Sequence, residues 1–127
     1  MIKRIVNTFN SARLDYMFTG ALAASYYGTP RTTMDVDVVV EVTKRNCLTR
    51  LVSALEMVGL KADRRKIDSA LRSNFRIVTF RDGKTPFTVD IILSRTKLMK
   101  KTGSILGLPT YYETPEGLIL AKLRMIK

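Results

Sequence analysis

The chain has 127 residues, of which 46% are hydrophobic, and it carries 22 Lys and Arg against 11 Asp and Glu, for a formal net charge of +11. This size and apolar content suit one packed core and exclude a disordered tail or a coiled coil. The charge favours anionic partners such as nucleotides, RNA or an acidic protein surface. With Cys47 as the one cysteine and no histidine, we expect no internal disulfide, zinc site or Ser-His or Cys-His catalytic pair.

No targeting or membrane segment is visible. The start of the chain leads into an amphipathic stretch without the apolar block of a signal peptide, and no window approaches the run of about 18 apolar residues that spans a membrane. We therefore expect a cytoplasmic protein with no membrane partner. Since no repeat, low-complexity tract or linker divides the sequence, we expect a single domain over residues 1–127.

The first third of the chain predicts two helices and two strands. Apolar residues recur at roughly helical intervals over 2–14, and the apolar run over 16–18 indicates a short strand. Gly20 breaks that run before a second helix predicted over 21–27. Over 35–42 three valines (36, 38 and 40) alternate with Asp35, Asp37 and Val39, and this period of two in β-branched residues is typical of a strand.

The middle of the chain predicts a helix and a hairpin. Leucines and valines at helical spacing over 48–58 form an apolar stripe that Gly59 ends. Segments 75–80 and 87–93 are typical of strands, and the Asp82-Gly83 step between them indicates an antiparallel pair.

After the hairpin we expect a loop over 103–109 and a brief edge strand over 110–113. Thr114 as the capping residue and Pro115 at the first helical position then predict a final helix. Residues 64–72, before the hairpin, are basic and weakly periodic.

Two acids, Asp35 and Asp37, head the strand predicted over 35–42. Strand residues two apart point to the same face, about 7 Å from each other, so both carboxylates face one side. Such a pair suits Mg²⁺, which accepts one or two carboxylates and completes its shell with water and phosphate oxygens. The alternative is a solvated strand end that carries two acids without a ligand.

A third acid, Asp90, lies in the otherwise apolar strand over 87–93. An unpaired carboxylate is costly to bury, so Asp90 requires a partner, a metal ion or solvent. If this strand lies beside 35–42, the three acids can flank two metal ions about 4 Å apart, which activate an attacking oxygen and stabilise a leaving pyrophosphate. A surface salt bridge to Lys or Arg is the alternative.

Gly20 stands where the first strand gives way to a helix, and backbone N–H groups at a helix N-terminus can receive a phosphate. Taken alone, Gly20 is better explained as a turn glycine. Its position, with one predicted helix between it and the strand over 35–42, favours a role in phosphate binding.

The stretch from Tyr16 to Asp37 resembles the signature of the nucleotidyltransferase superfamily, which runs Thr-Gly-Ser or Gly-Gly, a helix, Gly-x-x-Arg-x-Thr and Asp-x-Asp. It is most similar to small prokaryotic members related to the abortive-infection toxin nucleotidyltransferases. The similarity continues over 89–93, around the third acid, and over 114–123, which is similar to the family's Ser-Pro-Glu-Asp-Leu-Ile-x-x-Lys-Leu helix.

The resemblance implies an α/β (α+β) fold, with a mixed sheet of about four to five strands flanked by helices, like the catalytic palm of DNA polymerase beta. It implies that two Mg²⁺ ions direct transfer of a nucleoside monophosphate from a nucleoside triphosphate to a hydroxyl group. The acceptor is an unknown protein or RNA, and a toxin–antitoxin pair is one setting for such an enzyme.

The resemblance also implies roles for individual residues. Gly20 and Ala21 would line the triphosphate, Asp35 and Asp37 would bind both metal ions, and Asp90 would hold the catalytic metal beside the acceptor hydroxyl.

For two basic residues in the matched motifs, two alternative roles stay open. Arg31 either approaches phosphate or braces the loop before the acid strand. Lys122, in the last helix, either reaches an anion or is solvated.

The sequence departs from the family pattern in two places. Ala21 stands where many members have Ser or a second Gly, and the lost hydroxyl costs about 1 kcal/mol of phosphate affinity. Gly117 replaces the acid of the last helix, at a cost of about 1 kcal/mol in helix propensity. Because relatives continue beyond the position of Lys127, we also expect a second substrate-binding element from a protein partner or from another copy in a homo-oligomer.

A different class of function is a non-catalytic basic module that keeps the fold and binds RNA or a protein partner. Basic clusters at Arg64-Arg65-Lys66 and over 95–101 either supply phosphate contacts, which salt would weaken steeply, or are solvated charge. The requirement for metal separates the two functions, since only the enzyme needs its three acids to share Mg²⁺.

Overall fold

The computed structural model describes residues 2–20, 23, 35–43, 46–62, 65–67, 69 and 77–125; at 35 and 121–125 only the backbone is described. The helices within these ranges are α1 (Ile2–Ser11), α3 (Cys47–Met57) and α5 (Pro115–Met125). The strands are β1 (Tyr16–Thr19), β2 (Asp35–Glu41), β3 (Leu60–Lys61), β4 (Ile77–Asp82), β5 (Thr88–Ser94), β6 (Lys100–Ile105) and β7 (Leu108–Glu113). The predicted helix over 21–27 lies, apart from Ala23, outside the described residues.

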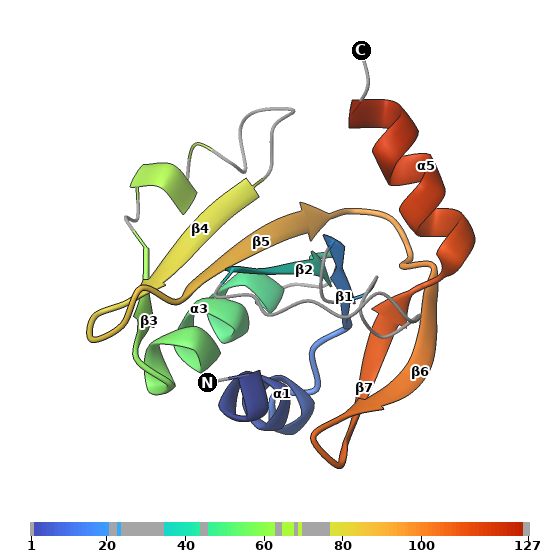
Figure 1. Cartoon of the computed structure of the whole chain (residues 1–127). Helices are drawn as coiled ribbons and strands as arrows, with labels where there is room; N and C mark the ends of the chain where they lie inside the picture. Colours follow the sequence, from blue (N-terminus) through green and yellow to red (C-terminus); the bar gives the residue numbers. More distant parts are fainter. Residues whose placement is uncertain are drawn as a thin grey trace.

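One mixed sheet organises the molecule (Figure 1). Its strand order is β3-β4-β5-β2-β1-β7-β6, in which β2 pairs with β5 and β1 with β7 in parallel while the other neighbours are antiparallel. The mixed sheet with flanking helices and the antiparallel β4–β5 hairpin are confirmed.

The expected strand number is wrong, because the sheet has 7 strands rather than four to five. A strand as short as β3 is too brief for a periodic signal. Strand β6, which replaces part of the loop expected over 103–109, lacks alternating apolar residues; it forms because Leu106 and Gly107, at φ 50° and 80°, turn the chain back along β7. Strand β7 is likewise not an edge strand, since it lies between β1 and β6.

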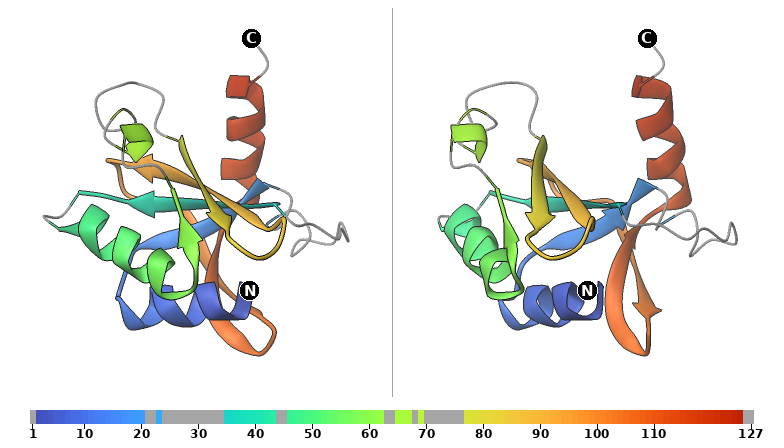
Figure 2. Two further views of the ribbon diagram at one scale, coloured as in Figure 1. Left: turned by 90° about the vertical axis from the view of Figure 1, so that its left-hand side faces the viewer. Right: turned by 60° about the vertical axis from the view of Figure 1, so that its left-hand side comes forward.

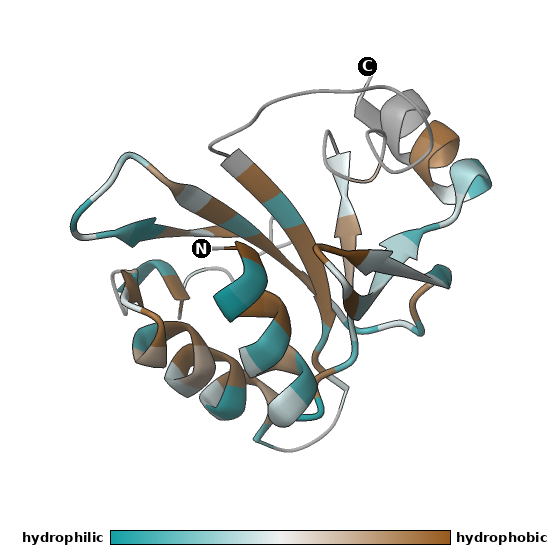
Figure 3. Cartoon of the chain, turned by 60° about the horizontal axis from the view of Figure 1, so that its bottom comes forward, coloured by the Kyte–Doolittle hydropathy of each residue, from teal (hydrophilic) through white to brown (hydrophobic). Residues whose placement is uncertain are grey.

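Helices α1 and α3 cover one face of the sheet, which we call the covered face (Figures 1 and 2). Hydrophobic and hydrophilic residues alternate along α1 in Figure 3, and Ile5, Val6 and Phe9 form its buried stripe. These side chains join one cluster with the buried side chains of α3 and the inward residues of the central strands: Leu51, Ala54, Leu55, Tyr16, Phe18, Val36, Val38, Val40, Val89, Ile91 and Leu93.

The opposite face, which we call the open face, carries neither α1 nor α3. Helix α5 leaves the end of β7 and projects on this side (Figures 1 and 2). It begins where the sequence predicts, because the Gly117 N–H donates to the Thr114 hydroxyl at 3.2 Å and caps the first turn. None of the described helices combines the length and apolar composition needed to cross a bilayer.

Candidate functional site

The acid-bearing strands are neighbours. Strands β2 and β5 run parallel with Asp37 aligned to Asp90 and Asp35 aligned to Thr88. Neighbouring strands lie about 4.8 Å apart, and aligned residues of a parallel pair point to the same face. The adjacency on which a shared carboxylate site depends is therefore present. Asp37 and Asp90 are both half-buried on the open face.

The alternation of β2 explains why the acids point outward. Val36, Val38 and Val40 are buried among the helices on the covered face, so the residues between them must face the other way. A one-residue slip would bury Asp37 and expose the valines, at a large cost in burial and desolvation. The apolar pattern of the covered face thus determines the position of the acids on the open face.

Polar residues continue on both sides of this pair and form what we call the acid row. It crosses the sheet through the aligned residues Thr79, Asp90, Asp37 and Thr19, and ends at Glu113 on β7. Thr79 donates to Asp90 Oδ1 at 2.6 Å, and Thr19 donates to Glu113 Oε1 at 2.7 Å. Two hydroxyl groups therefore hold the outer carboxylates of the row in place.

Gly20 follows the acid row directly and lies against Asp37. Its φ of 63° is left-handed, and a Cβ built there would collide with Asp37 Oδ2 and lie 3.2 Å from Asp37 Cγ. A glycine is therefore required for both backbone conformation and close approach.

The donor set of the row fits Mg²⁺, which prefers carboxylate oxygens and keeps waters and phosphate oxygens in its remaining positions. Asp37 and Asp90 provide such oxygens from adjacent strands. Within the side chains that the structure describes, which do not include Asp35, no three of His, Cys, Asp and Glu group around a common metal position.

Several residues assigned by resemblance can be placed only in part. Ala21 and Arg31 lie outside the described residues. Asp35 is placed by its backbone at the start of β2, and Lys122 by its backbone in α5.

Sequence reasoning missed Glu113, which it placed on an edge strand without a role. Its side chain is only 9% exposed, because β7 is interior and α5 turns over it. A Cβ at Gly117 would lie 2.8 Å from Glu113 Cγ and 3.2 Å from Glu113 Cδ. The absence of a side chain at Gly117 therefore makes room for Glu113, and no local pattern in the sequence signals this contact.

A hollow of about 450 Å³ borders the acid row on the open face. Its floor includes Met17 and Val39, which with Leu98 form a small buried cluster separate from the main core. Thr19 and Glu113 also line the hollow, as do Gly117 and Leu120 of α5. Ser94, Arg95, Thr96 and Lys97 line it as well, so the hollow combines an apolar floor with polar and basic walls.

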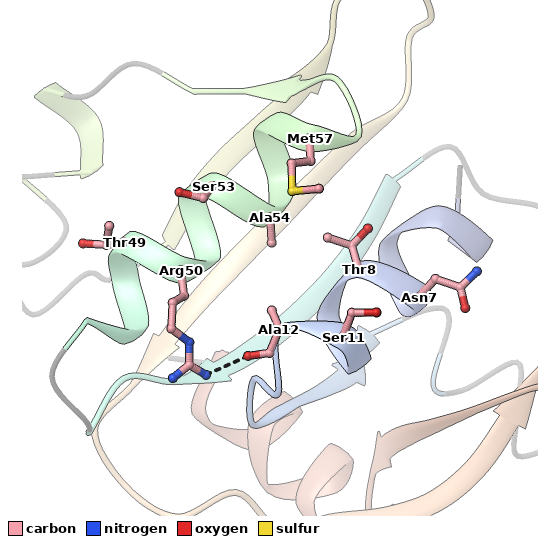
Figure 4. A pocket seen from close by; sticks show the side chains of 9 residues that line it. All are labelled: Asn7, Thr8, Ser11, Ala12, Thr49, Arg50, Ser53, Ala54 and Met57. Carbon is pink, nitrogen blue, oxygen red and sulfur yellow. Dashed lines mark hydrogen bonds between the residues drawn. The ribbon is translucent and has the colours of Figure 1, made fainter.

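A second hollow, of about 550 Å³, lies between α1 and α3, away from the acids (Figure 4). The Arg50 guanidinium donates to the carbonyl oxygens of Ala12 and Arg13, both at 2.9 Å, and so satisfies groups just past the end of α1. Neither Asp37 nor Asp90 lines this second hollow, and we assign it no part in the candidate site.

Comparison with known proteins finds similarity in structure. No family model and no curated protein matches the sequence. The structure of ANT(2")-Ia in complex with adenylyl-2"-tobramycin is similar with a TM-score of 0.71 at 15% identity, over 98% of this chain and 73% of that one. TM1012 of Thermotoga maritima, provisionally described as a nucleotidyltransferase, is similar with a TM-score of 0.68 at 12% identity, over 98% of this chain and 81% of that one. The resemblance found in the sequence is thus confirmed at the level of the fold, and the chain has the nucleotidyltransferase fold.

Proposed function

We propose that the protein is a Mg²⁺-dependent nucleotidyltransferase that moves a nucleoside monophosphate from a nucleoside triphosphate to a hydroxyl group of a protein or an RNA. The observation that carries the proposal is the alignment of Asp37 with Asp90 on the open face, with Gly20 against Asp37. The fold shared with nucleotidyltransferases supports it.

The proposed transfer makes one bond and breaks one. The acceptor oxygen bonds to the α-phosphorus, the bond from that phosphorus to the oxygen shared with the β-phosphate breaks, and pyrophosphate leaves with the bonding electrons. The hydroxyl proton passes to a carboxylate, for which we assign Asp90, oriented by the Thr79 hydroxyl on its Oδ1.

The remaining roles follow the resemblance. Asp35, Asp37 and Asp90 would hold two Mg²⁺ ions, which supply charge neutralisation for the triphosphate and activation of the acceptor oxygen. Gly20, Ala21 and the basic Arg31 would contact the phosphates. These contacts pair an anionic substrate with a chain whose net charge is +11.

The first test is calorimetric titration of each of the four nucleoside triphosphates with and without Mg²⁺. We expect metal-dependent binding in the natural protein and at least tenfold weaker binding in Asp37→Asn and in Asp90→Asn. Asp15→Asn is the control, because Asp15 pairs with Lys100 at 3.6 Å on another part of the surface.

The outcome that contradicts the proposal is an absence of Mg²⁺-dependent binding for every triphosphate, or binding that neither site variant changes. A strongly salt-dependent affinity for RNA without any triphosphate binding would instead favour the non-catalytic basic module.

We further propose that the acceptor is presented with help from a partner protein or a second copy of the chain, and that a toxin–antitoxin pair is the setting. Transfer of label from an α-labelled triphosphate to total RNA or protein, with growth arrest on expression that the Asp37→Asn variant abolishes, tests this proposal.

A further inference from the structure

We propose that a basic groove at the start of α1 binds an acidic, amphipathic segment of a partner protein. The residues that line this groove come from the start of α1, the connection from α3 to β3, the β4–β5 hairpin and the β6–β7 turn. Figure 2 shows the start of α1 between these two turns of the sheet. The inference goes beyond the proposed function, because it concerns a binding surface and does not depend on transfer chemistry.

The groove is strongly basic. Five exposed cationic side chains line it, against the one carboxylate of Asp82, and they are Lys3, Arg4, Lys61, Arg81 and Lys84. No salt bridge joins any of the five to an acid within the parts of the chain that the structure describes. Lys61 and Arg81 also lie directly opposite each other in the β3–β4 pair, where like charges are destabilising. Carboxylates of a ligand would relieve this repulsion.

The groove also exposes apolar side chains. Met57 and Leu106 are the two most exposed large hydrophobic residues among those described, at 82% and 70%, and both line this groove. Leu106 has a φ of 50°, a left-handed conformation that Asn or Gly adopts at lower cost than leucine. A leucine here suits neither the backbone nor the solvent, and an apolar side chain of a partner would cover it.

The size and lining of the groove favour a protein segment over other ligands. Its volume of about 1,250 Å³ exceeds the range of about 300–1,000 Å³ that small-molecule sites occupy. Single-stranded nucleic acids stack on exposed aromatic side chains, whereas Phe87, the aromatic residue of the described lining, is buried. A second copy of the chain is a poor match, since each copy has a net charge of +11. The ligand that fits combines acidic residues with a few apolar ones.

The test uses a fluorescent synthetic peptide of about twelve residues, in which glutamates surround leucines at every third or fourth position. We expect fluorescence anisotropy to show binding that weakens at least tenfold when glutamine replaces the glutamates, and at least tenfold when serine replaces the leucines. Lys61→Gln combined with Arg81→Gln should also weaken binding at least tenfold. Lys66→Gln combined with Lys101→Gln is the matched control, because it removes the same charge from exposed side chains outside the groove and should change the affinity less than threefold.

A single substitution tests the apolar contact. Leu106→Asn suits the left-handed backbone, so folding is not at risk, and it should weaken peptide binding at least threefold. Ile119→Asn is its control, because Ile119 is 61% exposed on α5 and lies outside the groove.

Three results would overturn the inference: no binding of the peptide, equal binding of its serine form, or equal losses in the groove variants and their controls. The last result would mean that the net charge of the chain attracts the peptide without a specific site. An RNA duplex that binds more tightly than the peptide, and is lost in the Lys61→Gln and Arg81→Gln variant, would also overturn it and assign the groove to a nucleic acid.

Discussion

Val38 and Asp37 are neighbours in β2, yet they lie on opposite faces of one sheet and contribute different properties. The covered face meets α1 and α3 through side chains that are almost all fully buried. The open face carries the acid row and a hollow with an apolar floor and polar walls that no described helix fills. The strands are stabilised from one side, which leaves the other side able to present charged groups at little cost in folding.

The acids of the open face lower the free energy of unfolding only if they lack hydrogen-bond partners. Thr79 and Thr19 donate to Asp90 and Glu113, and these bonds belong to the open face alone. Stability therefore depends mainly on the covered face and ligand binding on the open face. Mutations on each face can test how independent the two properties are.

The most direct test uses two adjacent valines. Val38→Ala removes two carbons from the main core and should lower the free energy of unfolding by about 2 kcal/mol. Val39→Ala removes the same atoms from the floor of the hollow and should cost about 1 kcal/mol, because fewer neighbours lose contact. Urea unfolding measures both, and equal costs would show that the two faces do not differ in packing.

Gly20→Ala should impair ligand binding on the open face more than it lowers the stability of the fold. The left-handed φ costs an alanine about 1 kcal/mol of stability, and the new Cβ displaces the Asp37 carboxylate. We expect Mg²⁺-dependent triphosphate affinity to fall at least tenfold. Gly107→Ala is the control, because its φ of 80° imposes the same strain while a Cβ there meets nothing within 4 Å; equal effects of both variants on affinity would contradict the role of Gly20.

Gly117→Ala tests the link between α5 and the acid row. In a Glu113→Ala background, where the Thr114 hydroxyl at 3.2 Å is the close contact that remains for the new Cβ, it should stabilise the protein by at most about 0.5–1 kcal/mol through helix propensity. In the natural protein the gain should disappear, because the new methyl group pushes Glu113 away from Thr19. Thermal unfolding of the four proteins of this double-mutant cycle gives the coupling, and a coupling of zero would mean that Glu113 does not depend on Gly117.

The smallest expected effect lies in the β4–β5 turn. The Thr85 hydroxyl, which donates to Asp82 at 2.6 Å, holds the pKa of that carboxyl below its ordinary value. The bond therefore stabilises the protein above the ordinary pKa of an aspartate, and this contribution is lost as the pH falls through the lowered pKa. Asp82→Asn should flatten the part of the stability profile that lies below the ordinary pKa of an aspartate, about 4, without changing triphosphate binding.

The sequence predicts the elements well where a period is strong. Alternation along β2, the apolar stripe of α3 and the Thr114-Pro115 start of α5 all correspond to observed elements. Strand β6 could not be found this way, because Lys100–Ile105 has no apolar alternation and becomes a strand only through its pairing with β7. Tertiary context decides such a segment, whatever its local propensity.

The same limit applies to the candidate site. Asp37 and Asp90 stand out because each interrupts an apolar pattern, and their adjacency was expected only on condition that the strands pair. Glu113 gives no such signal, since it follows two tyrosines at the end of a strand. Its burial depends on the strand order and on the way α5 turns back over it, and neither can be read from a local pattern.

The parallel pairing of β2 with β5 has a consequence for folding kinetics. These strands are far apart in the chain, and long-range parallel pairing forms slowly because its loop entropy is lost before its contacts form. Asp37 and Asp90 come together only when Val38 has docked beside Ile91 on the other face. A newly made or partly unfolded chain therefore holds its acids apart, and any activity that depends on them begins only when the whole sheet has closed.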